Sequence, residues 1–211
     1  SHYHAVRTLG ASAFQADAII AHEQTRHLIA ERGRQDWESE FARMPRLFRE
    51  PSSIPGLTWP DLTFTDRLTI PLGGELVLQY CGRGHTAGDI VAWLAEHRIM
   101  FSCFKVAAPA ELYTGDAFHR DWATATLDRV AGFGAEALVG GRGPVARGEP
   151  AVAAAIAQTR EFLTVMQAEV SAVHVAGSSR SQAFAAAHAA LSPKYGGWPI
   201  FEHCLPRGNF L

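Results

Sequence analysis

Apolar residues near the start of the chain recur at the spacing of a helix. From residue 23 to about residue 48 they are separated by polar ones, which predicts an amphipathic helix. The positions are Leu28, Ile29, Trp37, Phe41, Met44 and Leu47. Gly33 is expected to break this helix into two pieces. Residues 10–16 are expected to form a short helix, and residues 18–21 a short buried strand.

The middle of the chain has the pattern of strands separated by turns. Pro51, Pro55 and Pro60 predict an extended connection in which no helix forms. After it, alternating or continuous apolar runs bounded by glycine predict strands, and Gly73-Gly74 predicts a hairpin turn. These strands are expected at residues 62–70, 75–81, 90–94, 99–106 and 137–139, the third and fourth joined at Glu96-His97.

The last third of the chain is rich in alanine and predicts helices at residues 149–175 and 178–191, after a shorter helix at 122–130. Ser178 or Ser179 is suited to cap the last of them. Strands in the middle with helices on both sides indicate a layered α/β sandwich. The length of 211 residues suits a single domain.

Composition narrows the classes of partner. Hydrophobic residues make up 47% and charged residues 19%, which is typical of a globular chain. The net charge of −2 argues against nucleic acid or an anionic membrane as a partner. No apolar run approaches the eighteen or so residues that a membrane helix needs. Three widely spaced cysteines suit reduced thiols, so a cytoplasmic location is expected.

Two short motifs carry candidate metal ligands. His2 and His4 are two positions apart, and on an extended backbone both rings point the same way toward one metal. The alternative to metal binding by His2 and His4 is a histidine pair on a strand without a ligand role, or the remnant of a tag. His85 lies in a glycine-rich loop between two strands, where the backbone bends tightly. Residues 140–145 form a similar loop that contains Arg142, and ordinary tight turns remain the alternative for these glycine-rich loops.

The order of these motifs resembles the metallo-β-lactamase superfamily over essentially the whole chain. His-Tyr-His at the start, Gly-His-Thr-Ala-Gly-Asp before an apolar strand, and Gly-Arg-Gly-Pro-Val after a later strand carry the resemblance. The resemblance implies a four-layer αββα sandwich. It also implies one zinc ion on His2, His4 and His85, with a fourth position open for water.

The second metal site of that superfamily is not preserved in this sequence. Its ligand positions are occupied by Val6, Arg7, Phe104 and Arg142, none of which binds zinc well. Two cations there would also repel a second ion. The sequence resembles a branch of the superfamily with His-Tyr-His-Ala-Val-Arg and Gly-Arg-Gly-Pro, and Cys103-Phe104 is a further departure of its own. We therefore expect one zinc ion at most.

The expected activity is hydrolysis of a small ester, thioester or lactone by water on a single zinc. Arg7 and Arg142 are expected to hold an anionic group of the substrate or to stabilise an oxyanion. The alternative for both is a salt bridge to a carboxylate such as Asp89 or Asp116. Asp116 is a candidate general base or stray ligand, and otherwise a turn former.

The remaining expectations concern Cys103, the N-terminal strands and the functions that compete with catalysis. Cys103 is a candidate fourth ligand that would make the zinc structural, or else a core cysteine. The first motif normally ends a strand well inside the fold, so N-terminal strands are expected to be missing. The chain would then be a fragment, or a second copy or another partner would supply the missing strands. A catalytically inactive member that binds an anion, and a partner-dependent scaffold, are the competing functions.

Overall fold

The computed structural model describes residues 1–50, 52, 54 and 56–208. The helices are α1 (Ala5–Thr8), α2 (Glu23–Arg43), α3 (His119–Asp121), α4 (Leu127–Ala131), α5 (Glu149–Val175), α6 (Arg180–Tyr195) and α7 (Phe201–Gly208). The strands are β1 (Ile20–His22), β2 (Leu62–Phe64), β3 (Arg67–Pro71), β4 (Glu75–Tyr80), β5 (Ile90–Leu94), β6 (Ile99–Cys103), β7 (Ala137–Gly140) and β8 (Ala146–Arg147). Short 3₁₀ turns occur at Ala11–Phe14, Pro45–Leu47 and Ala95–His97, and a π-helical turn at Trp122–Thr126 joins α3 to α4.

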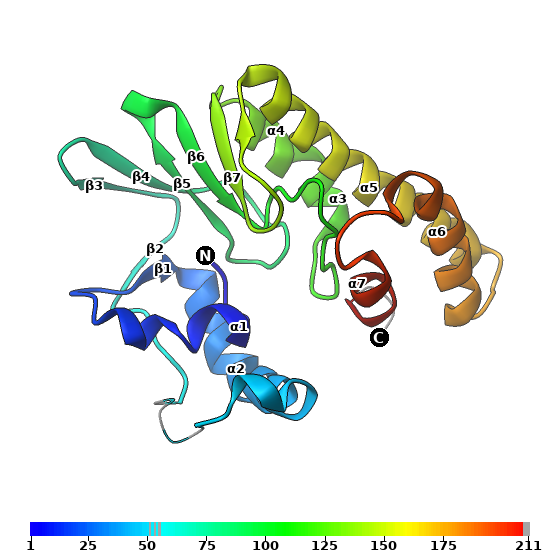
Figure 1. The fold of residues 1–211 in the computed structure, drawn as a ribbon, viewed down its shortest axis with the longest axis horizontal. Helices are drawn as coiled ribbons and strands as arrows, with labels where there is room; N and C mark the ends of the chain where they lie inside the picture. Colours follow the sequence, from blue (N-terminus) through cyan, green and yellow to red (C-terminus); the bar gives the residue numbers. More distant parts are fainter. Residues whose placement is uncertain (51, 53, 55, 209–211) are drawn as a thin grey trace.

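The strands form one large sheet and one small sheet. Strands β3 to β8 make a six-stranded sheet in chain order, antiparallel except for the parallel pair of β6 and β7. Strands β1 and β2 pair in parallel, with Ile20 opposite Leu62. Together with α1 and α2 they lie beyond one end of the large sheet, where the N-terminus is also found (Figure 1).

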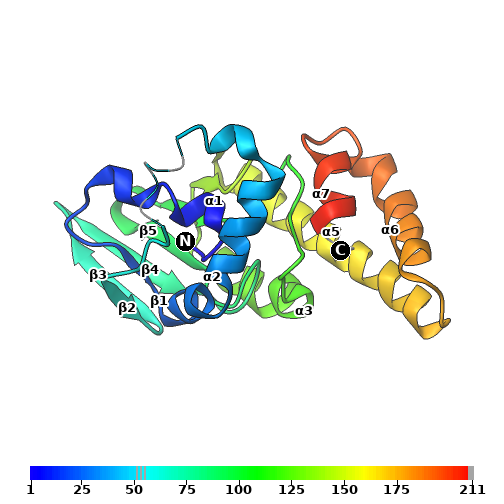
Figure 2. The same cartoon turned by 90° about the horizontal axis from the view of Figure 1, so that it is seen from below.

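One face of the large sheet is covered by helices. Val77, Trp93, Met100 and Leu138 lie side by side on adjacent strands, and all four are buried. They pack in the main core with residues of α4 and α5, among them Phe162, because alternate side chains of a strand point to the same face. Helix α6 runs back along α5, and α7 brings the C-terminal segment toward the N-terminal elements (Figures 1 and 2).

The opposite face of the sheet is apolar but poorly covered. The cross-strand rows on this face are Leu68, Leu78, Ala92, Phe101 and Val139, and next to them Ile70, Leu76, Leu94, Ile99 and Ala137. Leu78 is buried, but Phe101 remains 41% exposed, and the other members of the two rows are half-buried. Helices, a large sheet, a small second sheet and further helices are the components of the expected αββα sandwich.

The elements mostly follow the sequence pattern, with some corrections. The helix at Glu149–Val175 and the strand at Ile90–Leu94 have the expected bounds. The expected break at Gly33 is wrong, because α2 runs through it without interruption. The last predicted helix begins at Arg180, capped by Ser179, and continues to Tyr195. Pro51 and Pro55, part of the expected extended connection, lie outside the described residues.

Two further corrections concern strand ends and short helices. The single strand expected at residues 62–70 is two strands, because β2 pairs with β1 while β3 pairs with β4. The helix expected at 122–130 contains a π-helical turn before α4. No pattern had indicated α1 or α7. In the described part of the chain, no helix combines the length and the apolar character needed to cross a membrane.

Candidate metal centre

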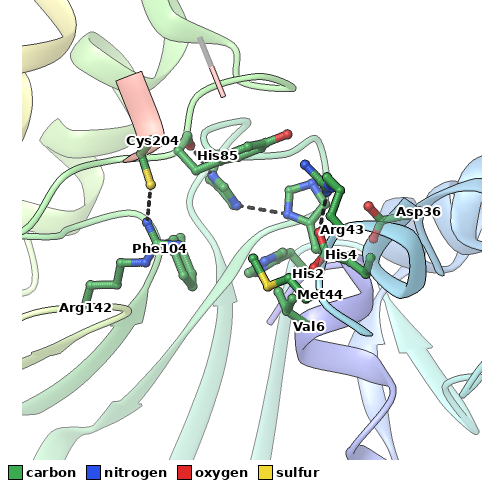
Figure 3. A pocket seen from close by; sticks show the side chains of 12 residues that line it. His2, His4, Val6, Asp36, Arg43, Met44, His85, Phe104, Arg142 and Cys204 are labelled. Atoms are coloured by element: carbon green, nitrogen blue, oxygen red, sulfur yellow. Dashed lines mark hydrogen bonds and ion pairs between the residues drawn. The ribbon is translucent and has the colours of Figure 1, made fainter. Parts of the chain in front are cut away.

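His2, His4 and His85 come together at the end of the large sheet that faces α2. His2 and His4 precede α1, and His85 lies in the loop between β4 and β5. One ring nitrogen of each lies within 4.8 Å of those of the other two. All three side chains are buried, and Figure 3 shows His4 and His85 turned toward each other. The two motifs predicted from the sequence therefore meet at one point.

The ring of His85 is fixed by a main-chain carbonyl. Its Nδ1 lies 2.7 Å from the carbonyl oxygen of Tyr113, so Nδ1–H donates and Nε2 carries the lone pair. Nε2 lies 3.2 Å from Nδ1 of His4. The loop itself is held by Asp89, which accepts from the main-chain N–H and the hydroxyl of Thr86. The loop also needs glycine at position 88, since a Cβ there would lie 2.4 Å from the main-chain nitrogen of Thr25.

The ring of His4 is fixed by a carboxylate on its outer side. Nε2 lies 2.9 Å from Oδ2 of Asp116, which also accepts from the hydroxyl of Tyr3 and lies 3.5 Å from Arg32. The hydrogen bond from His4 is the main reason that the pKa of Asp116 falls to about 2. Because Nε2–H of His4 donates outward to this carboxylate, Nδ1 is left with its lone pair facing His85.

His2 supplies a buried nitrogen with no protein partner. Its Nδ1 lies 3.1 Å from the hydroxyl of Ser1, whereas Nε2 is buried without a hydrogen bond among the described residues. Burial is the largest cause that lowers the pKa of His2 and that lowers the pKa of His85 to about 4. Both rings are therefore neutral near pH 7, the protonation state in which a histidine binds metal.

The residues fit a zinc ion. Two lone pairs that face each other at 3.2 Å repel unless a cation lies between them, and a buried unpartnered nitrogen costs stability. At Zn–N distances of 2.0–2.1 Å, nitrogens of a tetrahedral site lie about 3.3 Å apart. Outward N–H groups bonded to a carboxylate and a carbonyl are the usual support of ligating histidines. The cluster could hold one metal ion.

A cavity of about 550 Å³ opens over the cluster. It is lined by residues of the N-terminal segment, α2, the strand-end loops and α7, namely His2, His4, Val6, Asp36, Glu40, Arg43, Met44, His85, Phe104, Tyr113, Arg142 and Cys204. Small-molecule sites are lined mostly by apolar side chains with a few polar groups that fix the ligand, and the lining of this cavity contains both kinds of residue. Its size suits a small molecule.

The positions of the second metal site hold an aromatic ring and two cations. The guanidinium carbons of Arg7 and Arg142 lie 4.5 Å and 5.1 Å from the centroid of the Phe104 ring. His85 stacks on the same ring with centroids 4.8 Å apart, and His2 meets it edge-on with centroids 5.1 Å apart. Phe104, at one of the positions where the resemblance implies a lost metal ligand, therefore fills the space beside the histidines.

The other candidate residues lie around this centre without joining the histidine cluster. Asp116 lies behind His4 and is not among the residues that line the cavity. Cys103 is not part of the metal-binding group found among the described residues, and its thiol lies 4.0 Å from the carbonyl oxygen of Phe101. Asp89 pairs with buried Lys105 at 3.6 Å, so the alternative of a salt bridge from Asp89 to Arg7 or Arg142 does not form.

Sequence reasoning missed the residues that complete the cavity. Asp36 accepts from the main-chain N–H of Ala5, and so ties α2 to the segment that carries His4. Glu40 and Arg43 pair on the face of α2 toward the cavity, and Cys204 reaches it from α7. Helical spacing places Asp36, Glu40 and Arg43 on one face of α2, but that spacing alone does not say what the face meets.

Solved structures of similar fold are known. A metallo-beta-lactamase from Pontibacter korlensis superimposes with a TM-score of 0.58 at 23% identity, over 77% of this chain and 66% of that one. DIM-1 metallo-beta-lactamase gives 0.56 at 21% identity, over 78% and 66%. The metallo-beta-lactamase FIM-1 from Pseudomonas aeruginosa, in a mono-zinc form, gives 0.55 at 20% identity, over 76% and 64%.

These likenesses concern the fold. No protein-family model and no curated protein matches the sequence. The chain spans about two thirds of the length of the solved structures it resembles. The superpositions show that the described chain has the metallo-β-lactamase fold.

Proposed function

We propose that this protein is a hydrolase-like enzyme that uses at most one zinc ion, on His2, His4 and His85, against a small ester, thioester or lactone. The observation that carries the proposal is the set of three buried imidazoles with their lone pairs converging. When bound, zinc would supply a Lewis acid for a carbonyl and for water. The solved neighbours are named as metallo-beta-lactamases, one of them in a mono-zinc form.

The protein's own residues would position the ligands and the substrate. Asp116 and the carbonyl of Tyr113 orient His4 and His85, so each presents one fixed nitrogen. We propose this positioning role for Asp116. The general-base role expected from the sequence is the alternative, although Asp116 does not line the cavity and one of its carboxylate oxygens accepts from His4. Arg142 lines the cavity and is proposed to hold the substrate, together with Arg7.

A second candidate is a catalytically inactive member that binds an anionic ligand. Phe104 favours this second candidate, because its aromatic ring occupies a position where the resemblance implies a metal ligand, and two arginines lie over that ring. Such a protein would keep the cavity without turning over a substrate. The two candidates differ in whether the purified chain retains a stoichiometric metal ion.

Metal content decides between them. We expect about one zinc per purified chain by plasma emission spectrometry, and loss of that zinc in His85→Ala. His174→Ala is the matched control, because His174 is exposed on α5.

We expect Asp116→Asn to weaken zinc binding by about 10–100-fold in competition with a chelator, since outer partners of ligating histidines contribute that much.

The opposite results would be equally clear. No stoichiometric zinc in the unmodified chain would rule out the metal-dependent activity and leave the anion-binding candidate. Zinc retained equally by His85→Ala and His174→Ala would place the metal elsewhere. If one zinc is confirmed, a panel of esters, thioesters and lactones would follow with the same variants.

A further inference from the structure

Arg7 and Arg142 form a pair of like charges on one aromatic ring. Both guanidinium groups lie over Phe104, and the pKa of Arg7 is lowered by burial first and by the charge of Arg142 second. Contact with the ring face attracts each cation, but it leaves the repulsion between the two charges. Such a pair favours any negative charge that can lie against both.

The carboxylates around the pair are engaged elsewhere. Asp89 accepts a hydrogen bond from the main-chain N–H of Thr86 and pairs with Lys105. Asp116 accepts hydrogen bonds from His4 and Tyr3. On the α2 side, Asp36 accepts from the main-chain N–H of Ala5, and Glu40 pairs with Arg43. Neither Arg7 nor Arg142 forms an ion pair with a carboxylate in the described part of the chain.

Glu111 is the carboxyl group that comes nearest to neutralising Arg142, and burial prevents this. Its side chain is fully buried, and burial raises the pKa of Glu111 to about 9, although Arg142 and the main-chain N–H of Leu205 act in the opposite direction. The carboxyl is therefore neutral at pH 7. What Arg142 contacts is the main-chain carbonyl of Glu111, at 3.2 Å, and the thiol of Cys204, at 3.3 Å.

The pair lies beside the proposed metal site. Phe104 and Arg142 line the cavity together with the three histidines, and the Phe104 ring stacks on His85. Arg142 uses one terminal nitrogen, Nη1, for its protein contacts, which leaves the remainder of its planar fork for a ligand. Planar guanidinium groups match the two oxygens of a carboxylate or a phosphate.

We propose that Arg7 and Arg142, stacked on Phe104, bind an oxyanion group of the substrate, so that the substrate is a carboxylate- or phosphate-bearing ester, thioester or lactone. This inference rests on the proposed hydrolytic function for the scissile bond, but the anion site itself does not require zinc. The oxyanion would lie where the resemblance implies that the second metal ion has been lost. Its binding there would fix the distance between the anionic end of the substrate and the three histidines.

The test measures anion binding in the absence of metal. Protein freed of metal by a chelator is titrated with inorganic phosphate and, separately, with acetate by isothermal titration calorimetry. We expect both Arg7→Gln and Arg142→Gln to weaken the tighter of the two anions about tenfold or more, since a hydrogen bond to a charged group contributes that much. Arg67→Gln is the matched control, because it removes the same charge from an exposed position on β3.

Two further comparisons separate the possible outcomes. Arg142→Lys keeps the charge without the fork and is expected to bind more weakly than the unmodified protein and more tightly than Arg142→Gln. Circular dichroism of each variant shows whether it is folded. Tighter binding of phosphate would point to a phosphate-bearing substrate, and tighter binding of acetate to a carboxylate-bearing one.

The inference and the proposed function can fail separately. Absence of binding by both anions, or equal weakening in Arg142→Gln and Arg67→Gln, would overturn the anion site while leaving a zinc-binding result intact. Anion binding by a protein that holds no zinc would confirm the cation pair and remove the hydrolytic function.

Discussion

At the scale of single residues, Cys103 has a backbone conformation that suits glycine. Its φ angle is +51°, at the end of β6 where the chain turns beside the histidines. A side chain in this left-handed region costs roughly 1–2 kcal/mol, of which the greater flexibility of unfolded glycine offsets a part. We expect Cys103→Gly to raise the free energy of unfolding by about 0.5–1 kcal/mol in urea denaturation.

The control for that prediction is Cys103→Ala. It removes the thiol but keeps Cβ, so the backbone cost stays and the stability should change little. A gain of stability in the alanine variant equal to that of the glycine variant would mean that the thiol, and not the backbone, is unfavourable at this position. The resemblance marks Cys103-Phe104 as a departure of this sequence from its branch, and the φ angle of Cys103 is one that glycine adopts without cost.

The sequence reveals the three candidate ligands but not what holds them. His2, His4 and His85 stand in short motifs whose order could be matched to a known pattern. Their supports could not be found in that way, because Asp116 is 112 positions from His4 and Tyr113 is 28 positions from His85. No local pattern encodes a hydrogen bond over such a separation, so only the folded chain reveals these partners.

At the scale of elements, long periodic segments were predictable and short ones were not. Glu149–Val175 and Ile90–Leu94 have apolar patterns that match one kind of element and one buried face. The stretch from Leu62 to Pro71 has one alternating pattern, yet its two halves pair with different strands. Pairing of that kind depends on distant segments, and α1 and α7 are too short for periodicity to identify.

Gly33 shows why a glycine does not by itself end a helix. Helix α2 buries Gly33, and a Cβ built there would lie 3.4 Å from Cγ2 of Ile29 and 3.5 Å from Cδ1 of Leu57, which is ordinary van der Waals contact. Since alanine favours the interior of a helix over glycine, we expect Gly33→Ala to raise the free energy of unfolding by about 0.5–1 kcal/mol in urea denaturation.

Gly140→Ala provides the opposite case within the same fold. A Cβ at Gly140 would lie 2.7 Å from the carbonyl oxygen of Val106, so this variant should be less stable than the unmodified chain. Loss of stability in Gly33→Ala similar to that of Gly140→Ala would show that α2 packs too tightly against Leu57 to accept a methyl group.

At the scale of the whole molecule, the metal centre joins two parts of the fold. His2 and His4 belong to the N-terminal segment that packs with α2, whereas His85 belongs to the large sheet. A metal ion shared by the three would therefore link these parts. The same arrangement places the cavity between α2 and α7, so its two walls come from opposite ends of the chain (Figure 3).

The apolar second face of the large sheet gives a prediction for the molecule in solution. Phe101 is 41% exposed in one of the two adjacent cross-strand rows of this face, and neither row contains a charged side chain. Sheets with such faces pack against one another, and apolar burial contributes about 25 cal/mol per Å². We expect two copies of this 211-residue chain to associate through this face, with an average mass that rises with concentration in sedimentation equilibrium.

Phe101→Glu should weaken that association, because it would bring a charge into the contact between two apolar faces. Phe14→Glu is the matched control, since Phe14 is 83% exposed in the 3₁₀ turn Ala11–Phe14, away from the sheet rows. A constant monomer mass at every concentration would contradict the prediction. Equal weakening by both variants would attribute the association to net charge, whereas loss in Phe101→Glu alone would identify the uncovered face as the surface through which copies meet.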